Sequence, residues 1–254
     1  MHILLTNDDG IFAPGLAAMY RRLAGLGRIT VAAPSDIRSG VGHSISLEDL
    51  ACQKLDIVGK FTGYSIDGSP ADCVKLALNM LVEVKEPVDM VVSGLNHGAN
   101  VGINVFYSGT VAGAIEGAFY SLPAVAVSAA LDESFDVDKA ADYAYKVLCQ
   151  LLPLPARQVV NINIPELSLG RPRGIKVVPQ STVGFDESYQ LVPTPDGQEV
   201  YRLTGGNHRD VHDEQNWTDT TALSAGFITL TSLRLDLTEP NGNQSLSKKN
   251  ISLD

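Results

Sequence analysis

The sequence predicts an α/β protein in which a mainly parallel sheet is covered by helices on both faces. Two observations lead to this class. Short apolar runs alternate with segments of helical periodicity up to about residue 164, which is the pattern of successive strand–helix units. The 254 residues, of which 44% are hydrophobic and 19% charged, are also sufficient for one large buried core.

The expected elements begin with a strand at residues 3–5. A helix follows at residues 14–27, because Pro14 suits a first helical turn and because apolar residues recur there at helical spacing. Further strands are expected at residues 28–33, 52–58, 63–66, 90–92, 124–127 and 159–164, and further helices at residues 71–82, 108–120 and 137–151.

The pattern changes beyond residue 180. A turn at residues 192–197 separates two β-like runs, and residues 227–237 alternate as a strand does. The remainder, from residue 239 onward, is polar and is expected to be a loose tail or an arm on a neighbour. We therefore expect a core at residues 1–180 and a C-terminal arm with a β-hairpin at residues 181–254, an appendage of the kind that often serves oligomerisation.

Composition excludes several classes of function. The formal net charge is −10 without a basic cluster, so binding of a nucleic-acid polymer is not expected. No apolar run approaches the roughly 20 residues of a membrane span, and no signal-type segment opens the chain, so a cytoplasmic protein is expected. The cysteines Cys52, Cys73 and Cys149 lack metal-site spacing and are expected to be reduced core residues.

Oxygen-bearing residues follow three of the predicted strands. Because right-handed crossovers place the carboxyl ends of parallel strands along one edge, Asp8, Asp9, Ser39 and Asn96 are expected to lie together. Adjacent carboxylates repel each other, and a hard divalent cation such as Mg²⁺ or Mn²⁺ would compensate their charge. The alternative is that residues 7–10, Asn-Asp-Asp-Gly, are only a polar turn.

A second feature is the helix start at Ser108, Gly109 and Thr110. Hydroxyls and exposed N–H groups at such a position bind anions, and the helix dipole helps. Simple N-capping by Ser108 is the alternative. The Gly- and Asn-rich residues 93–102 precede this helix, and we expect them to form a long polar loop, which favours a binding role.

The histidines carry weaker signals. His43, in a polar loop, could move a proton or orient a phosphate, although a loop histidine is more often solvated. The same holds for His97, beside Asn96. His208 and His212 are four residues apart, but no third ligand is near them, so a zinc site is not expected.

Two common nucleotide-binding motifs are absent. Gly10 and Gly15 have P-loop spacing, but Leu16 and Ala17 stand where Lys and Ser or Thr must follow. No Gly-x-Gly-x-x-Gly follows the first strand, which argues against a dinucleotide site.

Taken together, six segments resemble the SurE (survival protein E) family. They are residues 3–10 (ILLTNDDG), 38–40 (RSG), 67–74 (DGSPADCV), 93–98 (SGLNHG), 107–111 (YSGTV) and 161–165 (NINIP). The last third is similar only near residues 218–219 and 226–233, and the family's usual Thr-Pro-Leu is Thr231-Ser232-Leu233 here. The resemblance implies a Rossmann-like three-layer core and a C-terminal arm exchanged between the subunits of a homodimer or homotetramer.

The resemblance also implies an activity and a site. It implies a metal-dependent nucleotidase that releases phosphate from nucleoside 5′- and 3′-monophosphates, some members also acting on short polyphosphate. It implies one divalent ion, Mg²⁺ or Mn²⁺, in each subunit. The family's metal ligands fall on Asp8, Asp9, Ser39 and Asn96, and its phosphate-binding segment falls on Ser108, Gly109 and Thr110, with Asn96 close by.

Our hypothesis from the sequence is metal-assisted hydrolysis of a phosphomonoester. Asp8 or Asp9 would accept a proton from the attacking water, and His43 is a weaker candidate for the proton donor and for phosphate contact. A nucleoside hydrolase, which also uses N-terminal aspartates around a metal, is one alternative. The lack of an Asp-x-Asp before Asp8 and Asp9 argues against it. A non-catalytic nucleotide-binding protein is the other.

Overall fold

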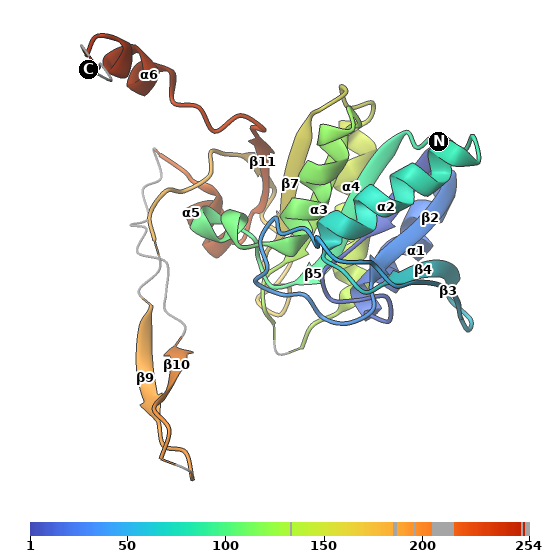
Figure 1. Cartoon of the computed structure of the whole chain (residues 1–254), viewed down its shortest axis with the longest axis horizontal. Coiled ribbons are helices and arrows are strands. Elements are labelled where there is room, and N and C mark those ends of the chain that lie inside the picture. Colours follow the sequence, from blue (N-terminus) through green and yellow to red (C-terminus); the bar gives the residue numbers. More distant parts are fainter. Residues whose placement is uncertain (133, 185–186, 196, 205–215, 250, 252–254) are drawn as a thin grey trace.

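The computed structural model describes residues 1–132, 134–184, 187–195, 197–204, 216–249 and 251 (Figure 1). Among these residues, the main sheet has nine strands in the order β3-β4-β2-β1-β5-β6-β7-β11-β8, and a separate hairpin pairs β9 with β10. The strands are β1 (His2–Thr6), β2 (Arg28–Pro34), β3 (Cys52–Ile57), β4 (Phe61–Ile66), β5 (Met90–His97), β6 (Ala124–Ala129), β7 (Val159–Ile164), β8 (Ile175–Val177), β9 (Ser188–Val192), β10 (Val200–Thr204) and β11 (Ile228–Leu233).

The six central strands, from β4 to β7 in the sheet order, are all parallel, as the sequence predicts. Strand β3 is antiparallel to β4 at one edge, and β11 is antiparallel to β7 near the other. The helices are α1 (Pro14–Leu23), α2 (Pro70–Glu83), α3 (Gly109–Phe119), α4 (Val137–Leu151), α5 (Asp219–Ser224) and α6 (Pro240–Ser247), with 3-10 turns η1 (Ala24–Leu26) and η2 (Gly102–Phe106).

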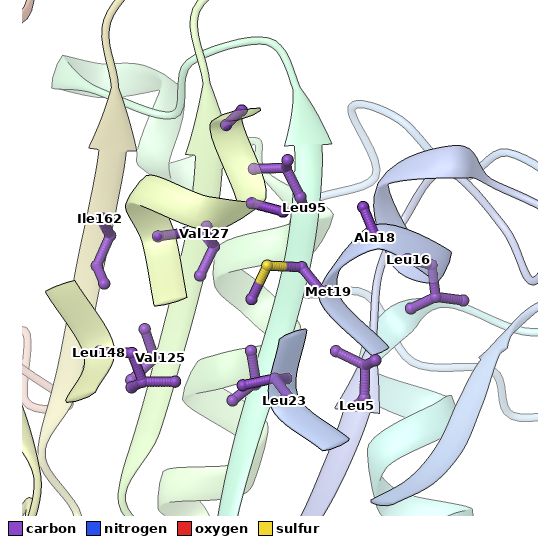
Figure 2. Packing of buried hydrophobic residues seen from close by; sticks show 14 of the residues in the cluster. Leu5, Leu16, Ala18, Met19, Leu23, Leu95, Val125, Val127, Leu148 and Ile162 are labelled. Carbon is purple, nitrogen blue, oxygen red and sulfur yellow. The ribbon is translucent and has the colours of Figure 1, made fainter. Parts of the chain in front are cut away.

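Helices cover both faces of the sheet because strand side chains alternate between them. On β1, Ile3 and Leu5 pack in a layer with α1 and α4, whereas Leu4 packs in a layer with α2 and α3. Figure 2 shows part of the first layer, with Met19 of α1 and Leu148 of α4 among the labelled residues. The predicted three-layer arrangement is therefore confirmed.

Helix α3 lies unusually close to the sheet, which positions its first turn beside the ends of β1 and β5. A Cβ added at Gly117 would lie 2.5 Å from a methyl of Val91, and one at Gly113 would lie 3.1 Å from both Thr6 and Ser93. Only glycine permits this approach without displacement of the helix.

Strand β5 is longer than predicted. The sequence suggests a strand at residues 90–92 followed by a polar loop, but β5 continues to His97, and its register against β6 shifts between Ser93 and Asn96. Beyond Ser93 the parallel neighbour β6 supplies the backbone partners, opposite Asn96 and His97, and this pairing outweighs the turn preference of Gly and Asn. The loop therefore starts only at Gly98.

The C-terminal third re-enters the sheet. Strand β11 inserts between β7 and β8 and ends at Leu233, four residues before the predicted strand end at Leu237. Two short helices were also not predicted: α5, capped by Thr218, and α6, within the expected loose tail. The segment 181–254 thus contributes a core strand as well as a hairpin and an arm that project from the body (Figure 1), and its role in assembly stays a prediction.

Two other findings bear on the sequence-based expectations. Cys73 is buried, but Cys52 and Cys149 are exposed, so the prediction of core cysteines is wrong for those two; they lie at the start of edge strand β3 and on the outer side of α4. Within the described part of the chain, every helix is too short or too polar to cross a lipid bilayer.

Candidate functional site

A cavity of about 600 Å³ opens at the carboxyl edge of the central strands. It lies where the chain order in the sheet reverses, since β1 leads to β2 on one side and β5 leads to β6 on the other. Ligands of open α/β sheets bind at this switch point. The cavity is lined by Asp8, Asp9, Ser39, Gly40, Asn96, His97, Gly98, Ala99, Asn100, Asn104, Tyr107, Ser108, Glu187, Tyr189 and Leu203.

Helix α3 and the loop after β2 both contact Asp8, which follows β1 and is only 4% exposed. The Thr110 hydroxyl, in the first turn of α3, donates to Asp8 Oδ1 at 2.5 Å. The N–H of Arg38, in the loop after β2, donates to the Asp8 carbonyl at 2.8 Å. A Cβ at Gly109 would lie 2.9 Å from the Asp8 Cβ, so glycine allows the helix to approach. These contacts bring Ser39, next to Arg38, to the same cavity as Asp8.

Asp9 and Asn96 complete the oxygen donors. The backbone N–H of His97 hydrogen-bonds to the Asp9 carboxylate, which ties Asp9 to the end of β5. Asn96 Nδ2 donates to the Gly98 carbonyl at 2.6 Å. Because the nitrogen end of this amide is engaged, its oxygen end is the one left for a cation.

Burial disfavours the charged form of both acids. It raises the pKa of Asp8 to about 6; the Thr110 hydrogen bond lowers that pKa, and the charge of Asp9 raises it further. Burial also raises the pKa of Asp9, against the lowering effect of His97. Ionising both carboxylates therefore needs a compensating positive charge.

The donor set fits a hard divalent cation. No lysine or arginine occurs among the described residues that line the cavity, so these residues do not supply the charge that two carboxylates and a phosphate require. The donors are carboxylate, hydroxyl and amide oxygens, which Mg²⁺ and Mn²⁺ prefer. Clusters of three or more His, Cys, Asp or Glu, as in zinc sites, are not found within the described ranges.

At the start of α3, both expected roles of the hydroxyls are visible. Ser108 Oγ accepts from the N–H of Val111 at 3.1 Å, so Ser108 is the N-cap, and it also lines the cavity. Thr110 contacts Asp8 through its hydroxyl and its N–H. Of the predicted phosphate segment, only Ser108 therefore lines the cavity. Thr110 instead hydrogen-bonds to Asp8, and Gly109 packs against the Asp8 Cβ.

Comparison with known proteins identifies the family. The model of the family named survival protein SurE matches residues 3–187. The chain belongs to this family. A 5′-nucleotidase SurE of Rhodopirellula baltica is 42% identical over 94% of both chains, and one of Syntrophobacter fumaroxidans is 39% identical over 99% of this chain and all of its own. The crystal structure of SurE from Aquifex aeolicus superimposes with a TM-score of 0.82 at 34% identity, covering 97% of this chain and 98% of that one.

The structure of this SurE chain places His43 apart from the acids. His43 lines a second, largely apolar cavity of about 480 Å³, which adjoins the first at Ser108. Its Nε2 lies 2.8 Å from Oε2 of the buried Glu116, and its ring stacks on Phe119. Glu116 also pairs with Lys75 at 3.2 Å. His208 and His212 lie outside the described residues.

Sequence reasoning did not assign several residues of the cavity. Asn104, Tyr107, Glu187, Tyr189 and Leu203 line it, but only Tyr107 lies in a segment that suggested a site. Tyr189 and Leu203 belong to the hairpin β9–β10. No local sequence pattern predicts that this hairpin lies beside the end of β1, which is more than a hundred residues earlier in the chain. The cavity thus combines the polar residues around Asp8 with the larger, more apolar side chains of Tyr107, Tyr189 and Leu203.

Asn100, which lines the cavity, was also not assigned from the sequence, and two asparagines of β7 hold its backbone. Asn163 exchanges two bonds with the Asn100 backbone, donating to its carbonyl at 3.1 Å and accepting from its N–H at 2.8 Å. Asn161 Nδ2 also donates to that carbonyl, at 2.7 Å. In addition, the buried Asp219 of α5 accepts from the N–H of Gly102 at 2.9 Å. These bonds hold the loop that follows β5.

Proposed function

We propose that this SurE-family protein is a metal-dependent nucleotidase that hydrolyses nucleoside monophosphates to nucleoside and phosphate. The observation that carries the proposal is the position of Asp8, buried at the junction of β1, α3 and the loop after β2, beside a cavity whose described lining offers oxygen donors and no lysine or arginine. Nucleotidase activity is further supported by the names of the relatives in Rhodopirellula baltica and Syntrophobacter fumaroxidans.

In this proposal Asp8, Asp9, Ser39 and Asn96 hold one divalent ion, Mg²⁺ or Mn²⁺, per subunit. A bound ion of this kind supplies positive charge to a phosphate and lowers the pKa of coordinated water. Thr110 fixes the orientation of the Asp8 carboxylate by bonding its Oδ1. Asn96 is held by its bond to the Gly98 carbonyl and so presents its oxygen in one orientation.

The remaining groups bind the substrate and move a proton. Ser108 lies in the cavity wall at the positive end of the α3 dipole, which supports a role in contacting the phosphate. The Asp9 carboxylate is less buried than that of Asp8 and accepts the proton of the attacking water. The water oxygen bonds to phosphorus, the ester P–O bond breaks, and the leaving nucleoside oxygen takes a proton from solvent.

The test is phosphate release from a panel of nucleoside 5′- and 3′-monophosphates and tripolyphosphate, measured with EDTA, Mg²⁺ or Mn²⁺. We expect release only with metal, and a loss of at least 100-fold in Asp8→Asn, because a metal ligand is removed. Asp49→Asn, at an exposed position outside the cavity, is the matched control and should behave as wild type. Full activity in EDTA or in Asp8→Asn would refute the metal assignment.

Product analysis separates the other functions. Release of free base without phosphate would identify a nucleoside hydrolase instead. Tight nucleotide binding without turnover under any metal would identify a non-catalytic binding protein. Either result would refute the proposed phosphomonoesterase.

We also propose that the protein acts in the cytoplasm as a homodimer or homotetramer assembled through residues 181–254. The projecting hairpin and the arm that carries α6 support this, since both leave the body of the fold (Figure 1). Light scattering of the full chain and of a chain ending at Thr238 tests the role of the α6 arm, because it gives the number of subunits in each particle. The same number of subunits for both chains would show that the α6 arm does not serve assembly.

A further inference from the structure

The lining of the site cavity has two chemically different parts. One part consists of oxygen donors: Asp8, which is buried, and the partly exposed Asp9 and Asn96. The other part is aromatic and consists of Tyr107 and Tyr189, with 59% and 70% of their surfaces exposed. The proposed phosphate chemistry uses only the oxygen donors, so the aromatic residues have no assigned partner.

The hairpin register explains how the apolar part is built. Tyr189 of β9 and Leu203 of β10 are directly opposite each other in the antiparallel pair, so their side chains leave the same face of the hairpin. Both line the cavity. The next pair on that face, Leu191 and Tyr201, is also exposed but does not line the cavity.

Tyr107 reaches the same cavity from the protein body and is held at its backbone. Its N–H donates to the Asn104 carbonyl at 3.0 Å, and its carbonyl accepts from the N–H of Gly42 at 2.9 Å. Tyr107 also directly precedes Ser108, the residue of the cavity wall that we propose contacts the phosphate. An aromatic side chain is therefore next in the chain to the proposed phosphate contact.

We propose that Tyr189 and Tyr107, with Leu203, form a stacking surface for the base of the nucleotide, and that they make the enzyme select aromatic phosphate esters over plain sugar phosphates. This rests on the proposed function. Bases stack on tyrosine irrespective of their hydrogen-bonding edges, because every base has a π-face. Glu187 also lines the cavity, and a carboxylate repels a phosphate but accepts hydrogen bonds from neutral donors such as those of a nucleoside.

The test compares two substrates that share a phosphate ester: AMP, which has a base, and ribose 5-phosphate, which has none. In Tyr189→Ala we expect KM for AMP to rise about tenfold, the lower range of a lost stacking contact, with kcat and the kinetics of ribose 5-phosphate unchanged. Tyr107→Ala should act in the same direction. Tyr189→Phe, which keeps the ring, should remain close to wild type.

Leu191→Ala is the matched control, because Leu191 shares the hairpin face but not the cavity. Equal loss on both substrates in Tyr189→Ala, with or without a change in mass by light scattering, would overturn the proposal and assign Tyr189 to folding or to subunit contact. No loss on AMP would overturn it as well.

Calorimetry with adenosine separates this inference from the proposed function. If neither phosphate ester is hydrolysed by the wild type, the nucleotidase proposal fails. Weaker adenosine binding in Tyr189→Ala than in wild type and Leu191→Ala would still support a base site. Equal adenosine binding in all three proteins would refute it.

Discussion

Thr110 donates a hydrogen bond of 2.5 Å to Asp8 and thereby joins the first turn of α3 to the end of β1. Both residues are buried, so the bond is a charge-assisted contact that water does not weaken. Asp8 is the most buried of the four proposed metal ligands, and Thr110 is the side chain that holds it. The pair is thus the structural centre of the site.

The first prediction concerns this pair. Thr110→Val keeps the shape of the side chain and removes the donor. Loss of a bond to a charged group costs about 1.5–3 kcal/mol, so we expect kcat/KM for a nucleoside monophosphate to fall roughly 10- to 100-fold. Thr110→Ser retains a hydroxyl and should keep most of the activity. Wild-type kinetics in Thr110→Val would show that the bond does not serve the site.

The second prediction is that the buried carboxylate destabilises the metal-free protein. Since the pKa of Asp8 is raised from 3.8 to about 6, the folded state binds this proton more tightly than the unfolded state. Stability is therefore lost as the pH rises from about 4 through 6. In EDTA at pH 8, we expect Asp8→Asn to increase the free energy of unfolding by up to about 3 kcal/mol.

Urea unfolding of both proteins in EDTA at pH 8 and pH 4 checks this. The gain in Asp8→Asn should shrink toward pH 4, where the wild-type Asp8 is protonated in the folded state. A variant that is less stable than wild type at pH 8 would contradict the prediction.

The third prediction concerns Glu116, which pairs with His43 and Lys75. Burial opposes ionisation of Glu116, but the hydrogen bonds from His43 and Lys75 outweigh it and lower the pKa below 4.5. The stability from this group is present above the unfolded pKa and is lost as the pH falls through the lower folded value. We expect Glu116→Gln to lower the Tm by about 2–5 °C at pH 7.5.

That difference in Tm between Glu116→Gln and wild type should narrow below pH 4. Since His43 is outside the acidic cavity, KM for a nucleoside monophosphate should change little in His43→Gln. A large fall in kcat for His43→Gln, with unchanged stability, would instead support a catalytic role for His43.

The fourth prediction concerns the loop after β5. Asn163→Ala removes both side-chain bonds to the Asn100 backbone in a buried location, and we expect the free energy of unfolding to fall by about 1–3 kcal/mol. Because Asn100 lines the cavity, KM should rise as well. Asn79→Ala, on the exposed side of α2, is the control. An equal effect of both variants on KM would show that the loop is not held by Asn163.

The sequence by itself was sufficient for the fold class, the family and most of the core elements. The helix at residues 137–151 and the strand at residues 159–164 were predicted with the boundaries that the structure has. Such segments are determined locally, by apolar periodicity and by a capping residue such as Asp136, whose carboxylate accepts from the N–H of Lys139. The grouping of Asp8, Asp9, Ser39 and Asn96 around one cavity followed from strand order alone, and their metal role remains a proposal.

Only the tertiary structure decided which distant residues meet. Pairing with β6 extended β5 through a Gly- and Asn-rich segment, and antiparallel pairing with β7 drew β11 into the sheet. Packing against Glu116 turned His43 away from the acids, and the hairpin register brought Tyr189 and Leu203 to the cavity. These outcomes depend on contacts between residues far apart in the chain. The free energies of such contacts cannot be inferred from the local pattern of side chains.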